Sequence, residues 1–140
     1  MKPEDPKLVV ALYLRGEHLD PELVTRAIGV QPSRTQKKGE RQVTSTGHEV
    51  AVKLGLWALV VEFDSPSLDA HLGRLTASLP NGGGLASIAG VEDAYIDVFV
   101  ALVSNSEGDA KCELHISSKV LEPLAGLGLP IRISVTAGQD

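Results

Sequence analysis

The chain contains few of the residues on which catalytic nucleophiles depend. One cysteine, Cys112, is present among 140 residues, so no disulfide can form within the chain and no CxxC motif exists. The GxSxG motif of serine hydrolases is also absent. His115 lies three residues from Cys112 in an expected strand, and this spacing places the two side chains on opposite faces. The sequence therefore indicates no nucleophilic active site.

Metal-binding and phosphate-binding motifs are lacking too. The histidines show no HxH or HxxxH spacing, and each is expected at the surface or in a loop: His18, His48, His71 and His115. Residues 81–84 read Asn-Gly-Gly-Gly, but the lysine and hydroxyl residue of a phosphate-binding loop do not follow them. A flexible connector is the favoured interpretation of these glycines. We therefore expect neither a metal ion nor another cofactor.

No run of apolar residues is long enough to span a membrane, and residues 1–7 lack the apolar core of a signal peptide. We therefore expect a soluble, cytoplasmic protein. Its formal net charge of −5 is uneven, since residues 1–60 carry nine basic and seven acidic side chains, whereas residues 61–140 carry four and eleven. The acidic second part argues against general binding of nucleic acid, which depends on neutralising phosphates.

What the chain does contain is a clear order of apolar patterns. Alternation over residues 8–15 predicts a strand, and Asp20, Pro21 and Gly29 have the character of a helix N-cap, first residue and C-cap. Residues 50–63 are apolar on both faces, with a break near Gly55, which predicts a central strand. A helix follows, with a stripe of leucines at Leu68, Leu72, Leu75 and Leu79.

The remaining patterns predict strands over residues 93–103, 112–117 and 131–135, with a third helix over 118–127. Strand, helix, strand, strand, helix, strand from residue 50 to 135 is the order of a ferredoxin-like βαββαβ core. We therefore expect one α/β (α+β) domain over residues 1–140, with short polar tips at 1–6 and 137–140. It should be a two-layer sandwich in which three helices back about five strands. The additional N-terminal strand and helix should extend the sheet or cover its open face.

A basic loop is the most distinctive polar feature. Residues 31–47 are the longest stretch expected to be irregular, and loops of this length are usually functional or mobile. The loop gathers four cations and one carboxylate, which are Arg34, Lys37, Lys38, Glu40 and Arg41. Such a cluster suits an acidic protein or a small anionic ligand, although a solvated charged loop is the common alternative.

Aromatic side chains are scarce, and the single tryptophan, Trp57, falls on the expected central strand. Trp57 is either part of the core, which is favoured, or an anchor in an interface. The candidates for the open sheet face are Tyr95, Asp97, Phe99 and His115. Base stacking on such a face is disfavoured because the basic, aromatic-rich motif of RNA-binding sheets is missing. An enzyme would need an acid–base pair such as Asp97 and His115 on adjacent strands.

The run from Asp20 to Glu22, together with Gly29, Pro32, Lys38-Gly39-Glu40 and Trp57 after Gly55, resembles a bacterial family. This is the domain of unknown function 4279, and the similarity extends over nearly the whole chain. The glycine-rich residues 81–84 depart from the family pattern. The resemblance implies a single α/β domain from a bacterium and brings no established activity, cofactor or catalytic residue.

We expect a non-enzymatic, cytoplasmic binding or interaction module, with an immunity-type protein as one form of it. The basic loop would supply the contacts, and Trp57 would be their anchor. A small-ligand sensor domain and an enzyme with an acid–base pair on the open face are the alternatives. The strand over residues 93–103 is apolar on both sides, so its second face is expected to be covered by the N-terminal unit or by a homodimer partner.

Overall fold

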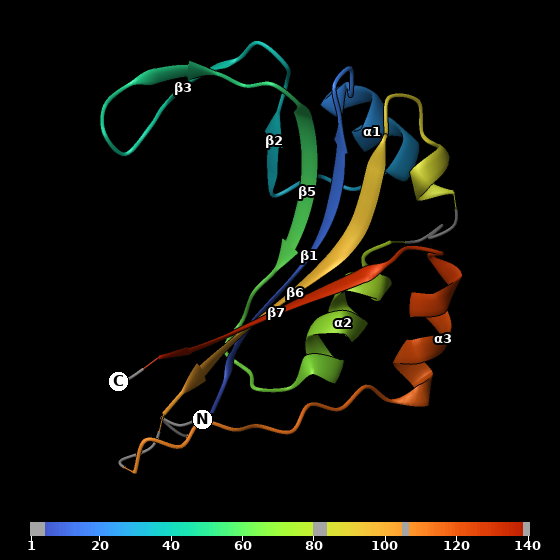
Figure 1. The fold of residues 1–140 in the computed structure, drawn as a ribbon. Helices are drawn as coiled ribbons and strands as arrows, with labels where there is room; N and C mark the ends of the chain where they lie inside the picture. Colours follow the sequence, from blue (N-terminus) through green and yellow to red (C-terminus); the bar gives the residue numbers. More distant parts are fainter. Residues whose placement is uncertain (1–4, 80–83, 105–106, 139–140) are drawn as a thin grey trace.

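The computed structural model describes residues 5–79, 84–104 and 107–138 (Figure 1). In chain order the elements are β1 (Lys7–Gly16), α1 (Pro21–Ile28), β2 (Arg34–Gln36), β3 (Arg41–Val43), β4 (Glu49–Ala51), β5 (Gly55–Val61), α2 (Leu68–Ala77), the 3-10 turn η1 (Leu85–Ser87), β6 (Asp93–Val103), α3 (Ser118–Gly126) and β7 (Ile131–Gly138). The described part of the chain is therefore a mixed α/β fold, as expected.

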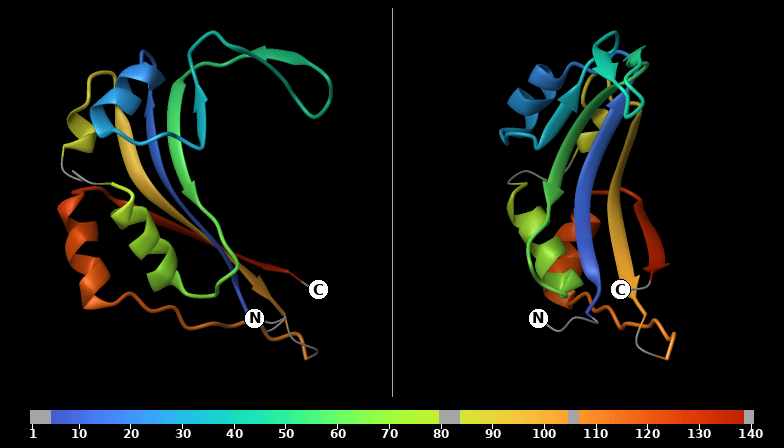
Figure 2. Two further views of the ribbon diagram at one scale, coloured as in Figure 1. Left: turned by 180° about the vertical axis from the view of Figure 1, so that it is seen from behind. Right: turned by 90° about the vertical axis from the view of Figure 1, so that its left-hand side faces the viewer.

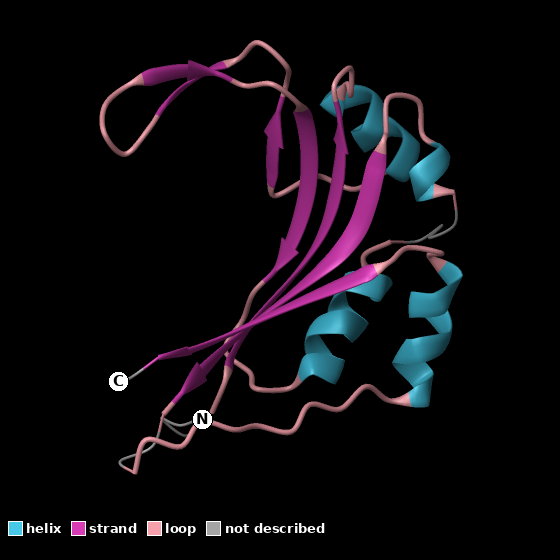
Figure 3. Cartoon of the chain, viewed as in Figure 1, coloured by secondary structure: helices cyan, strands magenta, loops and turns pink. Residues whose placement is uncertain are grey.

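Five strands form one sheet in the order β2-β5-β1-β6-β7 (Figure 3). β1 is antiparallel to both of its neighbours, β5 and β6, and β2 is antiparallel to β5. Only the last pair, β6 with β7, is parallel. The short strands β3 and β4 pair with each other in a hairpin outside this sheet.

The helices lie on one side of the sheet (Figures 1 and 2). Leu12 of β1 is in register with Leu59 of β5 and with Ile96 of β6, so these side chains share a face. The three leucines of α2, and Leu79 just after it, pack into the core and are at most 5% exposed, which confirms the predicted stripe. The sheet and helices together make the expected two layers around one apolar core.

Helix α1 begins and ends where local sequence signals predict. Asp20 accepts a hydrogen bond from the backbone N–H of Glu22 at 3.1 Å, and Pro21 occupies the first turn. Gly29 adopts a φ of 81° and donates its N–H to the Thr25 carbonyl, which a residue with a side chain would do under strain. The predicted caps are confirmed because each depends only on its neighbours in sequence.

One predicted strand is wrong. Residues 112–117 form an irregular segment that leads to α3, and β7 occupies the place beside β6. β1 already fills the other side of β6, so both ladders of that strand are satisfied and no position remains for residues 112–117. Their alternation nevertheless reflects half-burial, since Leu114 and Ile116 pack against the core. Without this strand, the ferredoxin-like arrangement of residues 50–135 is not confirmed.

The N-terminal unit is also placed differently from the expectation. β1 neither extends the sheet nor covers its open face, because it lies in the centre between β5 and β6. Helix α1 joins α2 on the same side, where Thr25 contacts the indole of Trp57.

The break near Gly55 and the central position of β5 are confirmed, since β5 begins at Gly55 and pairs with β1 and β2.

The expected long loop over residues 31–47 is only partly irregular, because it contains β2 and β3. The connector predicted at residues 81–84 falls largely outside the described residues, as do the outermost parts of the polar tips. Among the helices of the described ranges, none combines the length and apolar character needed to cross a membrane.

Candidate functional site

Exposed positive charge gathers in residues 34–53, which are called the basic segment below. They include five cations and two carboxylates, a net charge of +3, whereas the rest of the chain totals −8. Every charged side chain of the segment is exposed. The cations are Arg34, Lys37, Lys38, Arg41 and Lys53. The structure therefore concentrates positive charge at one end of an otherwise acidic molecule.

The basic segment runs from the edge of the sheet into a projecting hairpin (Figure 1). β2 pairs with β5, which fixes Arg34 opposite Ala58. A turn follows, in which the N–H of Glu40 donates to the Lys37 carbonyl at 3.0 Å. Next to the paired strands β3 and β4, the N–H of Val52 donates to the Glu40 carbonyl at 2.8 Å. The hairpin is thus tied to the sheet at its base and exposed beyond it.

Lys38 is held at the base of the hairpin by an ion pair with Glu17, in the turn after β1. The backbone N–H of Glu17 in turn donates to the carboxylate of Glu92 at 2.6 Å. The hydrogen bond from Lys38, and then its charge, hold the pKa of Glu17 below the usual range of a glutamate. Both partners are about half exposed, so this contact positions Lys38 more than it stabilises the fold.

Two adjoining hollows lie beneath the hairpin and share Arg15 and Leu54. The larger, of about 390 Å³, is lined by Arg15, Gln36, Gln42, Val50, Ala51, Val52, Lys53 and Leu54. The smaller, of about 230 Å³, is lined by Arg15, Gly16, Leu54, Glu92 and Asp93. Their walls therefore combine two cations and two amides with apolar surface, and two carboxylates stand at the far end. This mixture suits a peptide segment with acidic side chains.

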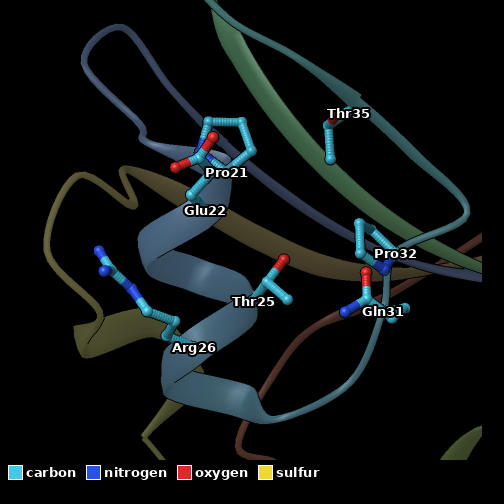
Figure 4. A pocket seen from close by; sticks show the side chains of 7 residues that line it. All are labelled: Pro21, Glu22, Thr25, Arg26, Gln31, Pro32 and Thr35. Carbon is cyan, nitrogen blue, oxygen red and sulfur yellow. The ribbon is translucent and has the colours of Figure 1, made fainter.

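A third hollow of about 430 Å³ lies on the helix side, between α1 and the segment that leads into β2 (Figure 4). Its lining consists of Pro21, Glu22, Thr25, Arg26, Gln31, Pro32 and Thr35. Figure 4 shows the hydroxyl of Thr25 turned towards the gap, whereas Arg26 extends away from it. The hollow thus offers mainly neutral polar groups and two proline rings.

Trp57 is fully buried and belongs to the core, so it is not an exposed anchor for the basic segment. Its Nε1–H donates to the hydroxyl of Thr25 at 3.0 Å. Thr35 is in register with Trp57, whereas Arg34 and Gln36 alternate to the opposite face of the sheet. Of the candidates expected to act together, the structure keeps the cations in one segment and places Trp57 elsewhere.

The helix-free face of the sheet brings together three of the four open-face candidates. Tyr95, Asp97 and Phe99 alternate along β6 on this face. Tyr95 is nonetheless only 8% exposed, because Tyr13 lies beside it at 5.5 Å between ring centroids and Arg132 covers its ring at 3.7 Å. The face is therefore partly filled by its own side chains.

His115 does not lie on that face, so the expected placement beside Asp97 is wrong. It belongs to the irregular segment before α3, and it is the least of the groups that lower the pKa of Asp69 in α2. Asp69 accepts a hydrogen bond from the backbone N–H of Ser117 at 2.6 Å, and this bond is the main cause of its lowered pKa. The acid–base pair that an enzyme would need on the open face is therefore not assembled from Asp97 and His115.

His71 differs from its expected surface position. It is fully buried in α2, its ring is stacked on Phe63 at 4.3 Å, and its Nδ1 lies 2.8 Å from the Ser67 carbonyl. Its Nε2 has no hydrogen-bond partner among the described residues. Within the described residues no group of three or more His, Cys, Asp or Glu side chains is arranged to hold a metal ion. His71 therefore acts as a core residue.

Sequence reasoning missed Arg15 and Lys53, which line the hollow beneath the hairpin. Arg15 lies on a strand 19 residues before the first cation of the basic segment, so no local signal joins the two. Lys53 follows the hairpin closely, and extending the basic loop by six residues would have included it. Only the return of the chain through β3 and β4 brings both cations to one wall.

The fold and these surfaces define a class: a small two-layer α/β domain with a projecting basic hairpin and helices on one side of the sheet. The chain belongs to the family described as Domain of unknown function (DUF4279), whose model matches residues 6–138. The resemblance read from the sequence is thereby confirmed. Comparison with curated proteins and with solved structures gives no match.

Proposed function

We propose that this protein is a non-enzymatic binding module that holds an acidic segment of a partner protein at its basic segment. The observation that carries this proposal is the separation of charge: the basic segment has a net charge of +3 in a chain whose other residues total −8. Cations held close together repel each other, and an acidic partner relieves that repulsion. The same separation repels acidic partners from the rest of the surface.

The hairpin adds apolar contact area to this charge. Val43 is 69% exposed and Val50 is 47% exposed, although both are β-branched residues that normally bury a face in a sheet. Val50 pairs with Gln42 and lines the hollow next to Lys53, whereas Val43 alternates to the other side of the hairpin. A bound segment would therefore meet a cation and an apolar side chain on the same wall.

The proposal is tested with a fluorescently labelled poly-glutamate peptide as the probe, by fluorescence anisotropy at two ionic strengths. The wild-type chain should bind the peptide more weakly as salt is added, because the contacts are between exposed charges. The double variant Lys37→Gln/Lys38→Gln should bind more weakly and should lose part of the salt dependence. Its urea midpoint should stay near that of the wild type, since exposed charges contribute little to stability.

The matched control is Lys111→Gln/Lys119→Gln, which removes the same charge from two exposed lysines outside the basic segment. This control should bind the probe as the wild type does. Equal losses in the two double variants would show that net charge alone attracts the peptide. That result, or a wild-type chain that does not bind the probe, would refute the proposal.

A small-ligand sensor is the second candidate, and the hollow beside α1 favours it. Its volume of about 430 Å³ lies within the range of known small-molecule sites. The indole of Trp57 is hydrogen-bonded to Thr25, which lies in the wall of this hollow. Trp57 is the only tryptophan in the sequence, so all tryptophan emission comes from beside this hollow. A metabolite screen that shifts both the melting temperature and the tryptophan emission would support this candidate. Emission that no tested compound changes would count against it.

We also infer a ferredoxin-like core in a different part of the chain from the one expected, formed by β1, α1, β2, β5, α2 and β6. Support comes from the strand order β6-β1-β5-β2 and from the antiparallel pairing of each neighbouring pair. The β3–β4 hairpin is then an insertion, and α3 with β7 is a C-terminal addition. An experimental structure in which β1 lies outside the space between β5 and β6 would contradict this inference.

A further inference from the structure

The outer strand β7 is exposed along its whole length. All eight residues from Ile131 to Gly138 are exposed, although three of them are large and apolar. Ile131, Ile133 and Val135 are 41%, 59% and 57% exposed. Branched apolar side chains in a regular alternation normally face a core. Their exposure in this strand therefore needs a physical explanation.

The explanation lies in how α3 packs. Ile133 is in register with Val98 of β6, which places the apolar row of β7 on the helix side of the sheet. Val120 and Leu124 of α3 turn into the core next to α2 and do not cover this row. In Figure 1, β7 begins near α3 and runs away from it towards the C-terminus. The outer end of the helix layer is thus left open.

β7 also lacks the devices that keep an edge strand from pairing with another chain. Such edges are usually short, bulged or marked by proline or lysine. β7 has eight residues in continuous register with β6 and contains no proline or lysine. Its one charged residue, Arg132, turns inward to Asp93 at 3.3 Å and to the ring of Tyr95. The free edge is therefore long, regular and close to neutral.

Within the described residues β7 has β6 as its one neighbouring strand, so its outer edge offers a defined set of backbone hydrogen-bonding groups. The Pro130 carbonyl accepts a bond from Ile96 of β6, and the Gly138 carbonyl accepts one from Ser104. Even-numbered residues thus turn their backbone groups towards β6. Because these groups alternate along a strand, the N–H and C=O groups of Ile131, Ile133 and Val135 point to the free edge.

We propose that a second copy of this chain covers this edge, with β7 of each copy paired antiparallel across a two-fold axis. The two sheets would join into one sheet of ten strands. A two-fold axis places a strand opposite itself in the antiparallel sense, so one patch serves both subunits. Centred on Ile133, this register makes Ile133 a hydrogen-bonded pair with the partner's Ile133. Ile131 then lies opposite the partner's Val135, again with backbone groups that face each other.

Charge favours a second copy at this edge. In the proposed register, Arg132 lies opposite the partner's Ser134, so no like charges face each other across the joint. Two chains of net charge −5 repel each other over most of their surfaces, and a neutral, apolar edge lets them meet where that repulsion is least. The apolar rows of the two copies also lie side by side on the helix side, so that each shields part of the other from water.

Sedimentation equilibrium of the full chain over a range of concentrations tests the proposal. The wild type should sediment with twice the mass of the chain. Ile133→Lys should sediment as a monomer, because it places two ammonium groups opposite each other at the axis. Its urea unfolding should stay cooperative, since Ile133 is more than half exposed. The matched control, Val43→Lys, changes a valine of the hairpin that is also more than half exposed, and this variant should remain a dimer.

Cross-linking tests the register independently. In a Cys112→Ser background, Ile133→Cys should form a disulfide-linked dimer under mild oxidation. A hydrogen-bonded antiparallel pair has Cα atoms about 5.5 Å apart, within the usual range for a disulfide. Val43→Cys in the same background should stay unlinked. A wild-type chain that is monomeric at every concentration, or an Ile133→Lys variant that is still a dimer, would overturn the proposal.

Discussion

The two edges of the sheet differ in length, charge and apolar surface. β2 is three residues long and begins with Arg34, and Lys37 and Lys38 follow it. β7 is eight residues long, carries a single charge that is engaged inward, and exposes an apolar row. β2 therefore shows the short, charged character of a protected edge, whereas β7 shows the character of an edge that another strand covers.

This difference underlies the two kinds of association that we propose for this domain. A cationic edge repels a copy of itself and attracts an acidic partner, whereas a neutral edge accepts a copy of itself. The order β2-β5-β1-β6-β7 places the two edges at opposite ends of the sheet. Both kinds of association therefore use surfaces that do not overlap, and variants at one edge should leave the other unchanged.

The largest loss of stability is expected from substitutions in the core, on which both edges of the sheet depend. Leu72→Ala and Leu75→Ala each remove a fully buried side chain of α2, which packs against β1 and β5. Each should lower the free energy of unfolding by about 2–5 kcal/mol. Urea unfolding followed by circular dichroism measures this change. Leu121→Ala, at an exposed leucine of α3, is the control and should shift the free energy by only about 0.5 kcal/mol. Wild-type midpoints for both α2 variants would show that the helix is not packed as described.

A smaller loss of stability is expected from removing the hydrogen bond between Thr25 and Trp57, which lies near the β2 edge. Thr25→Val keeps the shape of the side chain but removes the hydroxyl that accepts the Nε1–H of the buried Trp57. An unsatisfied donor should cost about 1–3 kcal/mol of unfolding free energy. Urea unfolding followed by tryptophan emission measures the cost at the site itself. Thr46→Val, in the exposed hairpin, is the control. Dimer formation through β7 should be unaffected, and a Thr25→Val chain that becomes monomeric would contradict the independence of the two edges.

The smallest changes in stability are expected from two carboxylates, one on the β7 side of the sheet and one on the β2 side. Asp69 accepts the Ser117 N–H ahead of α3 and β7, and Glu17 pairs with Lys38 beside the basic segment. The pKa of each is lower in the folded chain than its usual value. A carboxyl whose pKa is lowered by folding stabilises the folded chain at pH values above its pKa in the unfolded chain, which is about 4. This stabilisation is lost as the pH falls through the pKa of the carboxyl in the folded chain. Asp69→Asn and Glu17→Gln should each make stability less dependent on pH in that acidic range.

Salt distinguishes the two carboxylates. Glu17 depends on the charge of Lys38, so added salt should reduce its contribution. Asp69 depends first on a backbone N–H, so its contribution should be less sensitive to salt. Urea midpoints of both variants and the wild type, measured across acidic pH at two salt concentrations, check this prediction. Equal salt sensitivity at the two sites would contradict the assignment of different causes.

Local patterns predicted the helices well. The caps of α1 and the leucine stripe of α2 were readable because each depends on spacing within one helical segment. The candidate cations of the basic segment were found for the same reason, since they are neighbours in sequence. The prediction of a strand over residues 112–117 was wrong because alternating half-buried side chains occur in two situations. They occur in strands, and also in extended segments that pack on a core without pairing with another strand.

The sequence by itself determined the three helices, the four longer strands β1, β5, β6 and β7, and where positive charge gathers. Only the tertiary structure decided that β1 lies in the centre of the sheet, that Trp57 is buried beneath α1, and that Arg15 meets Lys53 beneath the hairpin. It also decided that the apolar row of β7 is exposed while the similar row of β6 is buried. Alternation records that a strand has an apolar face, but whether a helix reaches that face depends on contacts between residues far apart in the chain.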